Sequence, residues 1–232
     1  FKIADFLLYG LFDYLNRFSC QIIFETDRAL FVEIAEIKRF IDFSHLVCML
    51  HGIILYPSHK GGSMEFLRAQ ASNLPELMHL FRAATRSMDE QGIFQWDELY
   101  PDEGIIQEDI RRANMTIGVT EGRIAVAFML DYCEDSDYES ADWHCRETQI
   151  VVLHRLCVHP DFQGQGVARK AMGYLENEVR SCGRKTIRLD AFSQNPAALH
   201  LYESCGYQKA GTIHYRKGLF YLYEKDLSDA FA

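Results

Sequence analysis

Two glycines, Gly164 and Gly166, lie where an apolar stretch gives way to an amphipathic one. Residues 150–153 are apolar and rich in β-branched side chains, and the run continues through Leu156 to Val158, which predicts a buried strand. From Val167 to Val179 apolar residues recur at every fourth position, which predicts a helix with one buried face. Glycine lets backbone come close to a ligand, and the first amides of a helix lack internal partners. The turn is therefore suited to bind a phosphate or a pyrophosphate.

The spacing of this turn excludes two common phosphate-binding motifs. Gly-x-x-x-x-Gly-Lys-Ser/Thr does not fit, and Gly-x-Gly-x-x-Gly would need a glycine where Arg169 stands. The segment does resemble motif A of the GNAT superfamily of acyl-CoA N-acyltransferases, Gln/Arg-x-x-Gly-x-Gly/Ala, through Gln163, Gly166 and Ala168. Val158-x-Pro160 matches the usual lead-in of that motif. Taken alone, the glycine pair is also compatible with a bare structural turn.

A second segment, 195–207, resembles another signature of the same family, Asn-x-x-Ala-x-x-Leu-Tyr-x-x-x-Gly-Phe/Tyr. It follows the first motif after one predicted helix and one predicted strand, as in the family. On these two motifs, the chain from Met64 to its end is identified as a member of the GNAT superfamily. The resemblance implies an α/β fold with a mixed, mostly antiparallel central sheet, splayed at the middle and covered by helices on both faces.

The pattern of the residues predicts the same order of elements after Met64: strand, two helices, three strands, helix, strand, helix and two strands. The expected ranges are strand 64–69, a helix that begins at Ser72 or Asn73, helix 101–113, strands 115–120, 123–130 and 150–158, a helix from 167 to a glycine cap at 183, strand 186–191, a helix opened by Asn195 and Pro196, and strands 207–211 and 219–226.

The implied reaction is transfer of an acetyl group from acetyl-CoA to a primary amine by direct attack. The pyrophosphate would rest on the amides from Gln163 to Ala168, and the amide of Cys157 or Val158 would face the thioester oxygen. The residues that the resemblance assigns to acetyl-CoA are Leu156, Cys157, Val158, Gln163, Gly164, Gln165, Gly166, Val167, Ala168, Arg169, Asn195 and Tyr202. Asn195 is also explained as a helix cap. A covalent acyl-enzyme on Cys157 is the less favoured route.

Two side chains are candidates for proton transfer. Tyr202 matches the family tyrosine that protonates the departing thiolate; a tyrosine that only covers the sheet is the alternative. Many relatives place a glutamate on the central strand as the base, whereas this chain has His154 and Arg155 there. His154 is the first candidate because histidine accepts a proton near neutral pH. Glu147 and Asp190 are the next candidates.

Three aromatic residues, Trp96, Tyr100 and Trp143, lie on segments that wall the acceptor site in the family, although aromatic side chains also simply pack well. Residues 131–147 form an acidic loop that either attracts an amine or is a solvated insertion. The expected acceptor is a small-molecule or peptide amine, whose identity the sequence leaves open. The net charge of −9 argues against a nucleic-acid partner.

Bulk properties fit a globular protein, with 48% hydrophobic and 25% charged residues among 232. No apolar run reaches the ~18 residues of a membrane span, and a secretory signal pattern is missing. Seven cysteines do not suggest a disulfide framework, so we expect a cytoplasmic protein. Cys133, His144 and Cys145 lack a second paired ligand set at zinc spacing, so no metal is expected.

Residues 1–63 differ from the rest of the chain. They hold eight of the sixteen phenylalanines and do not begin with methionine. A pair of helices packed on the main domain is one interpretation. The other is that the native product begins at Met64, since Lys60-Gly61-Gly62 can be encoded by a ribosome-binding sequence. We therefore divide the chain into an N-terminal extension, 1–63, and an acyltransferase domain, 64–232.

A function of a different class stays open at this point. A catalytically degenerate member of the family would bind acyl-CoA as a sensor or scaffold without turnover. Retention of Tyr202 argues against that interpretation, and the absence of the usual strand glutamate argues for it. The resemblance also makes a homodimer an arrangement to expect, because members of the family are often dimers.

Overall fold

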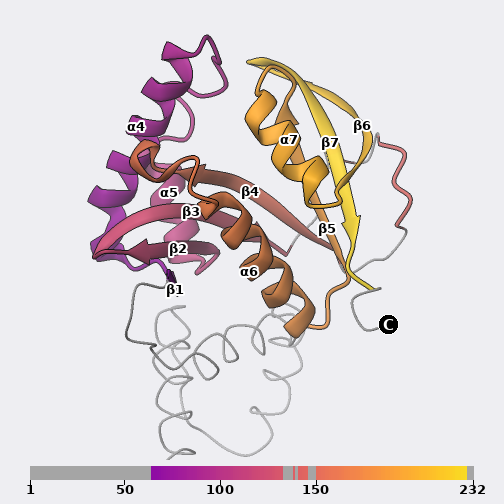
Figure 1. Ribbon diagram of the computed structural model, residues 1–232, viewed down its shortest axis with the longest axis horizontal. Coiled ribbons are helices and arrows are strands. Elements are labelled where there is room, and N and C mark those ends of the chain that lie inside the picture. Colours follow the sequence, from indigo (N-terminus) through magenta and orange to yellow (C-terminus); the bar gives the residue numbers. More distant parts are fainter. Residues whose placement is uncertain (1–63, 133–137, 139–140, 146–149, 229–232) are drawn as a thin grey trace, which may run out of the picture. The chain divides into compact units, whose positions relative to one another are not determined.

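The computed structural model describes residues 64–132, 138, 141–145 and 150–228 (Figure 1). These residues form a seven-stranded sheet in the order β1-β2-β3-β4-β5-β7-β6. Among the described strands, β4 and β5 make the one parallel pair, and every other neighbouring pair is antiparallel. The strands are β1 (Glu65–Arg68), β2 (Met115–Thr120), β3 (Arg123–Asp131), β4 (Ile150–Val158), β5 (Thr186–Phe192), β6 (Gln208–Tyr215) and β7 (Gly218–Asp226). The predicted mixed, mostly antiparallel sheet is confirmed.

Helices begin where their sequences supply a start signal. A short 3-10 turn, η1 (Ala71–Asn73), leads into α4 (Leu74–Glu90), which has proline in its first turn. The helix α5 (Glu103–Arg111) is shorter than the predicted 101–113. The Asp102 carboxylate caps its start by accepting from the Ile105 amide at 2.8 Å, and beyond its end Ala113 has a positive φ of 56°. The remaining helices are α6 (Val167–Ser181) and α7 (Pro196–Ser204). The order of the described elements is the predicted one.

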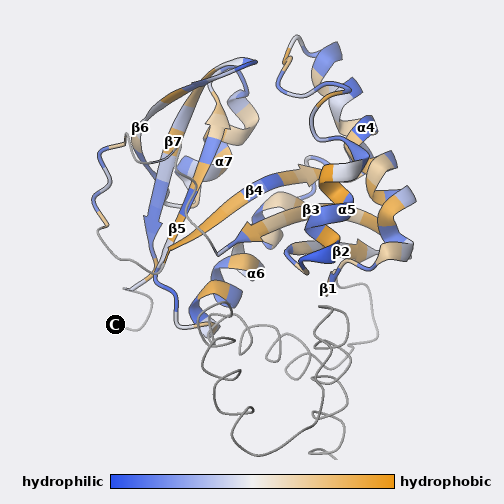
Figure 2. Ribbon diagram, turned by 180° about the vertical axis from the view of Figure 1, so that it is seen from behind, coloured by the Kyte–Doolittle hydropathy of each residue, from blue (hydrophilic) through white to orange (hydrophobic). Residues whose placement is uncertain are grey.

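The helices cover both faces of the sheet, and each face has its own apolar core (Figure 1). On one face, the predicted stripe of α6, from Val167 to Val179, is buried against Phe128 and Leu189. On the other face, Leu77 of α4 belongs to the second cluster. Full burial of such a side chain stabilises the fold by roughly 1.5–3 kcal/mol. The strand β4, mainly hydrophobic in Figure 2, lies between the two cores, as its largely apolar sequence predicted.

The strand β4 separates from β5 half-way along its length. The parallel ladder between them ends at the pair Leu153–Leu189, and from Asp190 to Phe192 the strand β5 keeps only β7 as its partner strand. At the same level β4 carries a bulge, because three steps from His154 to Cys157 match two steps on β3. Arg155 lies in this bulge with φ of 53°. The bulge bends β4 away from β5 and leaves one edge of its second half without a partner strand.

The last hairpin is longer than the sequence predicted. The strand β6 runs to Tyr215 rather than to residue 211, and Arg216 and Lys217 form the tip before β7. After Ala210 the residues alternate between exposed and half-buried, so the sequence lacks the buried apolar positions that would have indicated a longer strand. The tip is held by Asp97, which accepts two hydrogen bonds at 2.8 Å from the Arg216 guanidinium and one at 3.1 Å from Lys217. This ion cluster ties the hairpin to the loop that follows α4.

Candidate active site

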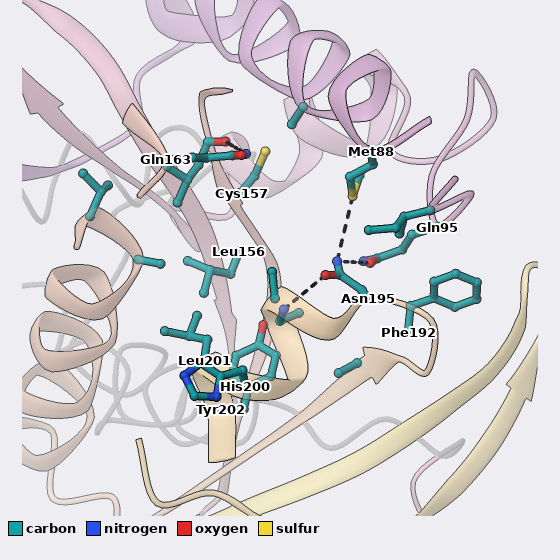
Figure 3. Close-up of a pocket in the computed structure, with 18 of the residues that line it drawn as sticks. Met88, Gln95, Leu156, Cys157, Gln163, Phe192, Asn195, His200, Leu201 and Tyr202 are labelled. Carbon is teal, nitrogen blue, oxygen red and sulfur yellow. Dashed lines mark hydrogen bonds between the residues drawn. The ribbon is translucent and has the colours of Figure 1, made fainter. Parts of the chain in front are cut away.

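A cavity of about 460 Å³ lies at the opening between β4 and β5 (Figure 3). Its walls come from the end of β4, the turn before α6, the helix α7 and the loop after α4. Twelve of the residues predicted to bind a ligand line it: Trp96, Leu156, Cys157, Val158, Gln163, Gly164, Gly166, Val167, Ala168, Arg169, Asn195 and Tyr202. The structure thus brings segments from three parts of the chain around one space.

The turn before α6 presents unpaired backbone amides to this cavity. Gly164 and Gly166 have φ of 73° and 75°, values that side chains rarely adopt, and no atom lies within 4 Å of a Cβ placed on either. The first hydrogen bond of α6 runs from the Lys170 amide to the Gly166 carbonyl at 3.0 Å, so the amides before Lys170 lack helical partners. These features fit a phosphate group held by backbone.

One amide of the predicted set already has a backbone partner. The Gln163 amide donates to the Pro160 carbonyl at 3.2 Å, because Gln163 closes the 3-10 turn η3 (Pro160–Phe162). Its side-chain amide donates to the Val158 carbonyl at 3.1 Å. The amides without helical partners therefore begin at Gly164. The Gln165 side chain donates to the Asp161 carbonyl at 2.8 Å and does not line the cavity.

The charges at the start of α6 favour an anion. A helix N-terminus carries a partial positive charge and normally attracts acidic side chains. Here the first turn has no acidic residue and holds two exposed cations, Arg169 and Lys170. Arg169 lines the cavity and donates to the Ser204 hydroxyl at 2.7 Å. Such an unfavourable charge pattern is expected where a ligand supplies the negative charge.

The register of β3 and β4 identifies which amide faces the opening. The His159 amide donates to the Ala125 carbonyl at 2.9 Å, so this pair is hydrogen-bonded. In antiparallel pairs the hydrogen-bonded and non-bonded positions alternate. Cys157 therefore bonds toward β3, whereas the Val158 amide points away from β3 into the gap that β5 has left. Of the two alternatives, Val158 is the residue whose N–H is available there.

Tyr202 is buried, yet its phenol oxygen points into the cavity (Figure 3). Its ring packs edge-on against Tyr207, with the two ring centroids 6.0 Å apart. Burial, followed by the negative charge of Asp190, raises the pKa of the Tyr202 phenol well above its ordinary value. The group therefore carries its proton at neutral pH.

Asn195 performs the capping role that the sequence predicted. Its side-chain carbonyl accepts from the Ala198 amide at 3.1 Å and starts α7. Its side-chain amino group donates to Gln95 at 3.0 Å and lies 4.0 Å from the Met88 sulfur (Figure 3). Both polar ends of Asn195 are thus engaged, and they join α7 to the loop after α4.

Cys157 belongs to the core on the α4 side of the sheet. Burial raises the pKa of the Cys157 thiol far above its usual range. A cysteine reacts as the thiolate, so this side chain is a poor nucleophile. The structure thus disfavours an acyl-enzyme on Cys157.

The candidate bases differ in position. Asp190 lines the cavity from β5 and is partly buried, and its carboxylate accepts from the Tyr138 hydroxyl at 2.6 Å. His154 is partly buried on β4 and does not line the cavity. Glu147 lies outside the described residues. Cys133, one of the three residues considered as metal ligands, also lies outside them. Among the candidates that the structure describes, Asp190 is the one that shares a space with Tyr202.

The three predicted acceptor-side aromatics are dispersed. Trp96 lines the cavity and packs edge-on against Phe81 with ring centroids 5.6 Å apart. Tyr100 is exposed, and the Arg155 guanidinium lies 5.6 Å from its ring centre. Trp143 stacks under Arg188, at 4.1 Å, and its indole nitrogen donates to the Tyr138 carbonyl. Only the first of these contributes to the cavity between β4 and β5.

Several lining residues had no sequence signal. Gln95 and Phe192 belong to a loop and a strand end, and they reach the cavity only because the chain folds them together. Arg155 does not line the cavity; the sequence showed it only as a departure from the usual glutamate, and its bulge has no local pattern. Across the described ranges, no group of three or more histidine, cysteine or acidic side chains could hold a metal ion. No described helix is long and apolar enough to cross a membrane.

Comparison with known proteins gives the same family as the two sequence motifs. The family model described as "Acetyltransferase (GNAT) family" matches residues 74–207. The L-amino acid N-acyltransferase MnaT of Escherichia coli is 41% identical over 76 residues, which is 33% of this chain and 42% of that protein. The [ribosomal protein bS18]-alanine N-acetyltransferase of Escherichia coli is 37% identical over 67 residues, 27% of this chain and 45% of that protein. The chain thus spans less than half the length of these curated relatives.

Solved structures resemble the fold over most of its length. A GNAT-family acetyltransferase from Streptococcus agalactiae has a TM-score of 0.62 at 21% identity, over 70% of this chain and 95% of that chain. The yncA protein of Salmonella typhimurium, solved with acetyl-CoA, has a TM-score of 0.51 at 18% identity, over 73% of this chain and 96% of that chain. At these identities the likeness concerns the fold.

Proposed function

The chain belongs to the GNAT family of acetyltransferases, and on this premise we propose that it transfers an acetyl group from acetyl-CoA to a primary amine by direct attack. The observation that carries the proposal is the opening between β4 and β5, where Tyr202 and the start of α6 line one cavity. A structural turn alone would not need two left-handed glycines and a basic first turn facing a cavity.

Acetyl-CoA is held mainly by backbone in this proposal. Its pyrophosphate lies on the amides from Gly164 to Arg169, where the helix dipole favours an anion. Arg169 adds a side-chain cation at the same end. The pantetheine arm follows the unpaired edge of β4 beyond Leu153. Backbone groups are suited to this task because their positions are fixed by the sheet before the ligand arrives.

The Val158 amide stabilises the charge that develops on the thioester oxygen. It points into the gap beside β5, as the register of β4 requires. In other acyl-transfer enzymes, a preorganised donor at such a position lowers the activation barrier by roughly 3–4 kcal/mol. The bulge at Arg155 shifts the register of β4 against β3, and this shift decides that the Val158 N–H points toward the gap.

Tyr202 donates the proton that the departing sulfur needs. Its phenol is neutral at the working pH, since burial raises its pKa. The amine must lose a proton before or during attack, and Asp190 or His154 accepts it, directly or through water. Asp190 has the advantage of sharing the cavity with Tyr202.

The acceptor is a primary amine. One relative is named for L-amino acids and another for an alanine of a ribosomal protein, and both names describe amines as acceptors. The net charge of −9 also favours a cationic substrate over an anionic one.

Binding of acyl-CoA without turnover is the second candidate function. It is favoured by the histidine and arginine that stand where many relatives have a glutamate. Release of free thiol from acetyl-CoA, measured against a panel of amines, separates the two. We expect amine-dependent release with saturation in both substrates. Thermal stabilisation by acetyl-CoA with no thiol release from any amine would make the protein a binder.

A further inference from the structure

Tyr138 is a fully buried tyrosine whose hydroxyl is bound to a residue of the cavity wall. Its side chain is 0% exposed and belongs to an apolar cluster with Ile150, Val152 and Leu222. The hydroxyl donates to Oδ1 of Asp190 at 2.6 Å. This distance is typical of a strong hydrogen bond from a hydroxyl to an ionised carboxylate.

Asp190 lies between Tyr138 and the cavity. On β5 it is paired with Leu222, so its side chain is on the face of the sheet where Tyr138 packs. It also lies one residue past the last pair of β5 with β4, and it lines the cavity at the opening. Because Oδ1 is held by Tyr138, the carboxylate has a fixed direction, and Oδ2 is the oxygen left for a ligand.

Tyr202 reaches the same cavity from the opposite face of the sheet. It belongs to the core beside α6, together with Leu189 and Ala191 of β5. Side chains alternate between the two faces along a strand, so these two neighbours of Asp190 point away from it. The amine and the departing thiolate are thus served from opposite sides of the opening, the first by Asp190 and the second by Tyr202.

The residues after Tyr138 hold it in place. The Trp143 indole nitrogen donates to the Tyr138 carbonyl at 2.8 Å, and the centres of the two rings are 5.9 Å apart. The buried carboxylate of Glu224 accepts from the amides of His144 at 2.6 Å and Cys145 at 3.2 Å. These contacts tie the described part of the loop to the sheet, so the Tyr138 hydroxyl also has a fixed direction.

We propose that Tyr138 is a positioning residue for the transfer, which holds the Asp190 carboxylate where it takes a proton from the acceptor amine. This inference rests on the proposed function and selects Asp190 as the base. A proton passes from the amine nitrogen to Oδ2, and the nitrogen lone pair forms the bond to the acetyl carbon. As the carbon–sulfur bond breaks, Tyr202 gives its proton to sulfur. Exchange with water then restores both side chains.

The direction of the carboxylate matters because a base must lie within hydrogen-bond reach of the proton that it takes. A misplacement of about 1 Å can lower a rate by about 100-fold. The loss of a donor by itself makes a carboxylate a stronger base, which would favour proton abstraction. A slower reaction without the Tyr138 hydroxyl therefore reports the position of the base rather than its strength.

A double-mutant cycle tests this inference. Thiol release from acetyl-CoA is measured with the best acceptor of a panel that contains the twenty L-amino acids, their amides and phenethylamine. Tyr138→Phe keeps the buried ring and should lower kcat by about 10-fold or more, with the KM of acetyl-CoA unchanged. Asp190→Asn should lower kcat by about 100-fold or more. Tyr138→Phe added to Asp190→Asn should change kcat by less than about twofold, because no base remains to be positioned.

Tyr223→Phe is the matched control. Tyr223 is also buried, and its hydroxyl donates to the Glu203 carboxylate at 3.0 Å, but neither residue lines the cavity. Its kcat should stay within about twofold of wild type. Acetyl-CoA affinity, measured by calorimetry, shows whether each variant is folded. If Tyr138→Phe is not, Asp190→Glu takes its place: the longer side chain moves the carboxylate away from Tyr138, and kcat should fall by about 10-fold or more although a base is kept.

The outcomes separate this inference from the proposed function. An unchanged or higher kcat in Tyr138→Phe, or in Asp190→Glu where that variant replaces it, overturns the inference while transfer stands. An equal loss from Tyr138→Phe with and without Asp190→Asn also overturns it, since Tyr138 would then act independently of Asp190. So does an unchanged kcat in Asp190→Asn, which would show that another group is the base. If the wild-type chain releases no thiol with any amine of the panel, the proposed function fails, and this inference fails with it.

Discussion

Tyr202 holds its phenol proton more tightly because of where the residue lies in the fold. Its ring is buried among Tyr207 and Tyr223, and its hydroxyl points into the cavity. The sequence motif pointed to this residue because the family signature is local, and the role of an acid is what the resemblance implies for it. The motif did not predict the second role of Asn195, which holds Gln95 across a sequence separation of 100. Contacts between distant segments depend on the whole fold, so no local pattern indicates them.

Tyr202→Phe tests the role of the phenol as an acid. The change removes one hydroxyl and keeps the volume of the ring, so the free energy of unfolding should change little. Turnover should fall by about 100-fold or more, and acetyl-CoA affinity should change far less, because the proton moves as the bond breaks. Steady-state kinetics and calorimetry measure the two effects. Tyr207→Phe is the matched control, since Tyr207 is buried next to Tyr202 but does not line the cavity. Turnover of Tyr202→Phe within about threefold of wild type would reduce Tyr202 to a packing residue.

The pH dependence follows from the same residue. The protonated phenol is the active form, so rate is lost as pH rises through its pKa. Burial raises that pKa above the ordinary value near 10. The pH–rate profile should therefore show no phenol-dependent decrease between about pH 7 and 9, with an alkaline limb above about pH 10 that is missing in Tyr202→Phe. A limb near pH 8 that disappears in Tyr202→Phe would contradict the direction of the shift.

Among the elements, the helix α6 was the most predictable and the bulge of β4 the least. The four-residue stripe and the glycine turn of α6 are local signals, and the structure confirms both. The bulge places an arginine, Arg155, in a backbone conformation that favours glycine. That conformation is imposed by pairing with β3 on one side and the lost pairing with β5 on the other. The sequence pattern of a strand indicates neither of these two constraints.

Gly166→Glu tests the start of α6 as the pyrophosphate site. The new side chain adds a negative charge and bulk at the helix start and strains a left-handed backbone by about 1–2 kcal/mol. Acetyl-CoA affinity should be lost while the protein remains folded. Gly173→Glu is the control, because it adds the same charge to an exposed position of the same helix with no atom within 4 Å of its Cβ. Retained micromolar affinity in Gly166→Glu, measured by calorimetry, would remove the anion site.

Asp97→Asn tests the ion cluster between the hairpin tip and the loop after α4. The change weakens three charge-assisted hydrogen bonds, to Arg216 and Lys217. The loop that carries Trp96 and Tyr100 should then be less well positioned. We expect the KM of the acceptor to rise severalfold with the KM of acetyl-CoA unchanged. Glu108→Gln, which breaks an exposed ion pair on α5, should leave both values unchanged; equal effects of the two variants would show that the cluster has no specific role.

The described sheet and helices form an apolar core on each face. The family model matches residues 74–207. At this scale the periods and start signals of the sequence predicted the order of the elements, and the family resemblance implied their mostly antiparallel pairing. The sequence did not indicate where β4 and β5 separate, because the separation depends on the bulge in β4.

A protein that begins at Met64 tests the division of the chain. We expect it to be monodisperse and to bind acetyl-CoA with the affinity of the full chain, because every described lining residue follows Met64. Light scattering and calorimetry measure both properties. Aggregation of the shorter protein would show that residues 1–63 cover apolar surface that must otherwise be hidden.

The central claim is that acetyl-CoA binds at the opening between β4 and β5 with its phosphates on the start of α6. Amide hydrogen exchange of the full chain, compared with and without acetyl-CoA, tests it most directly. We predict that the amides of Val158 and of residues 164–169 become protected, while those of α4 before Ala84 keep their exchange rates. Protection confined to other segments, with Val158 and residues 164–169 unchanged at saturating acetyl-CoA, would contradict the claim.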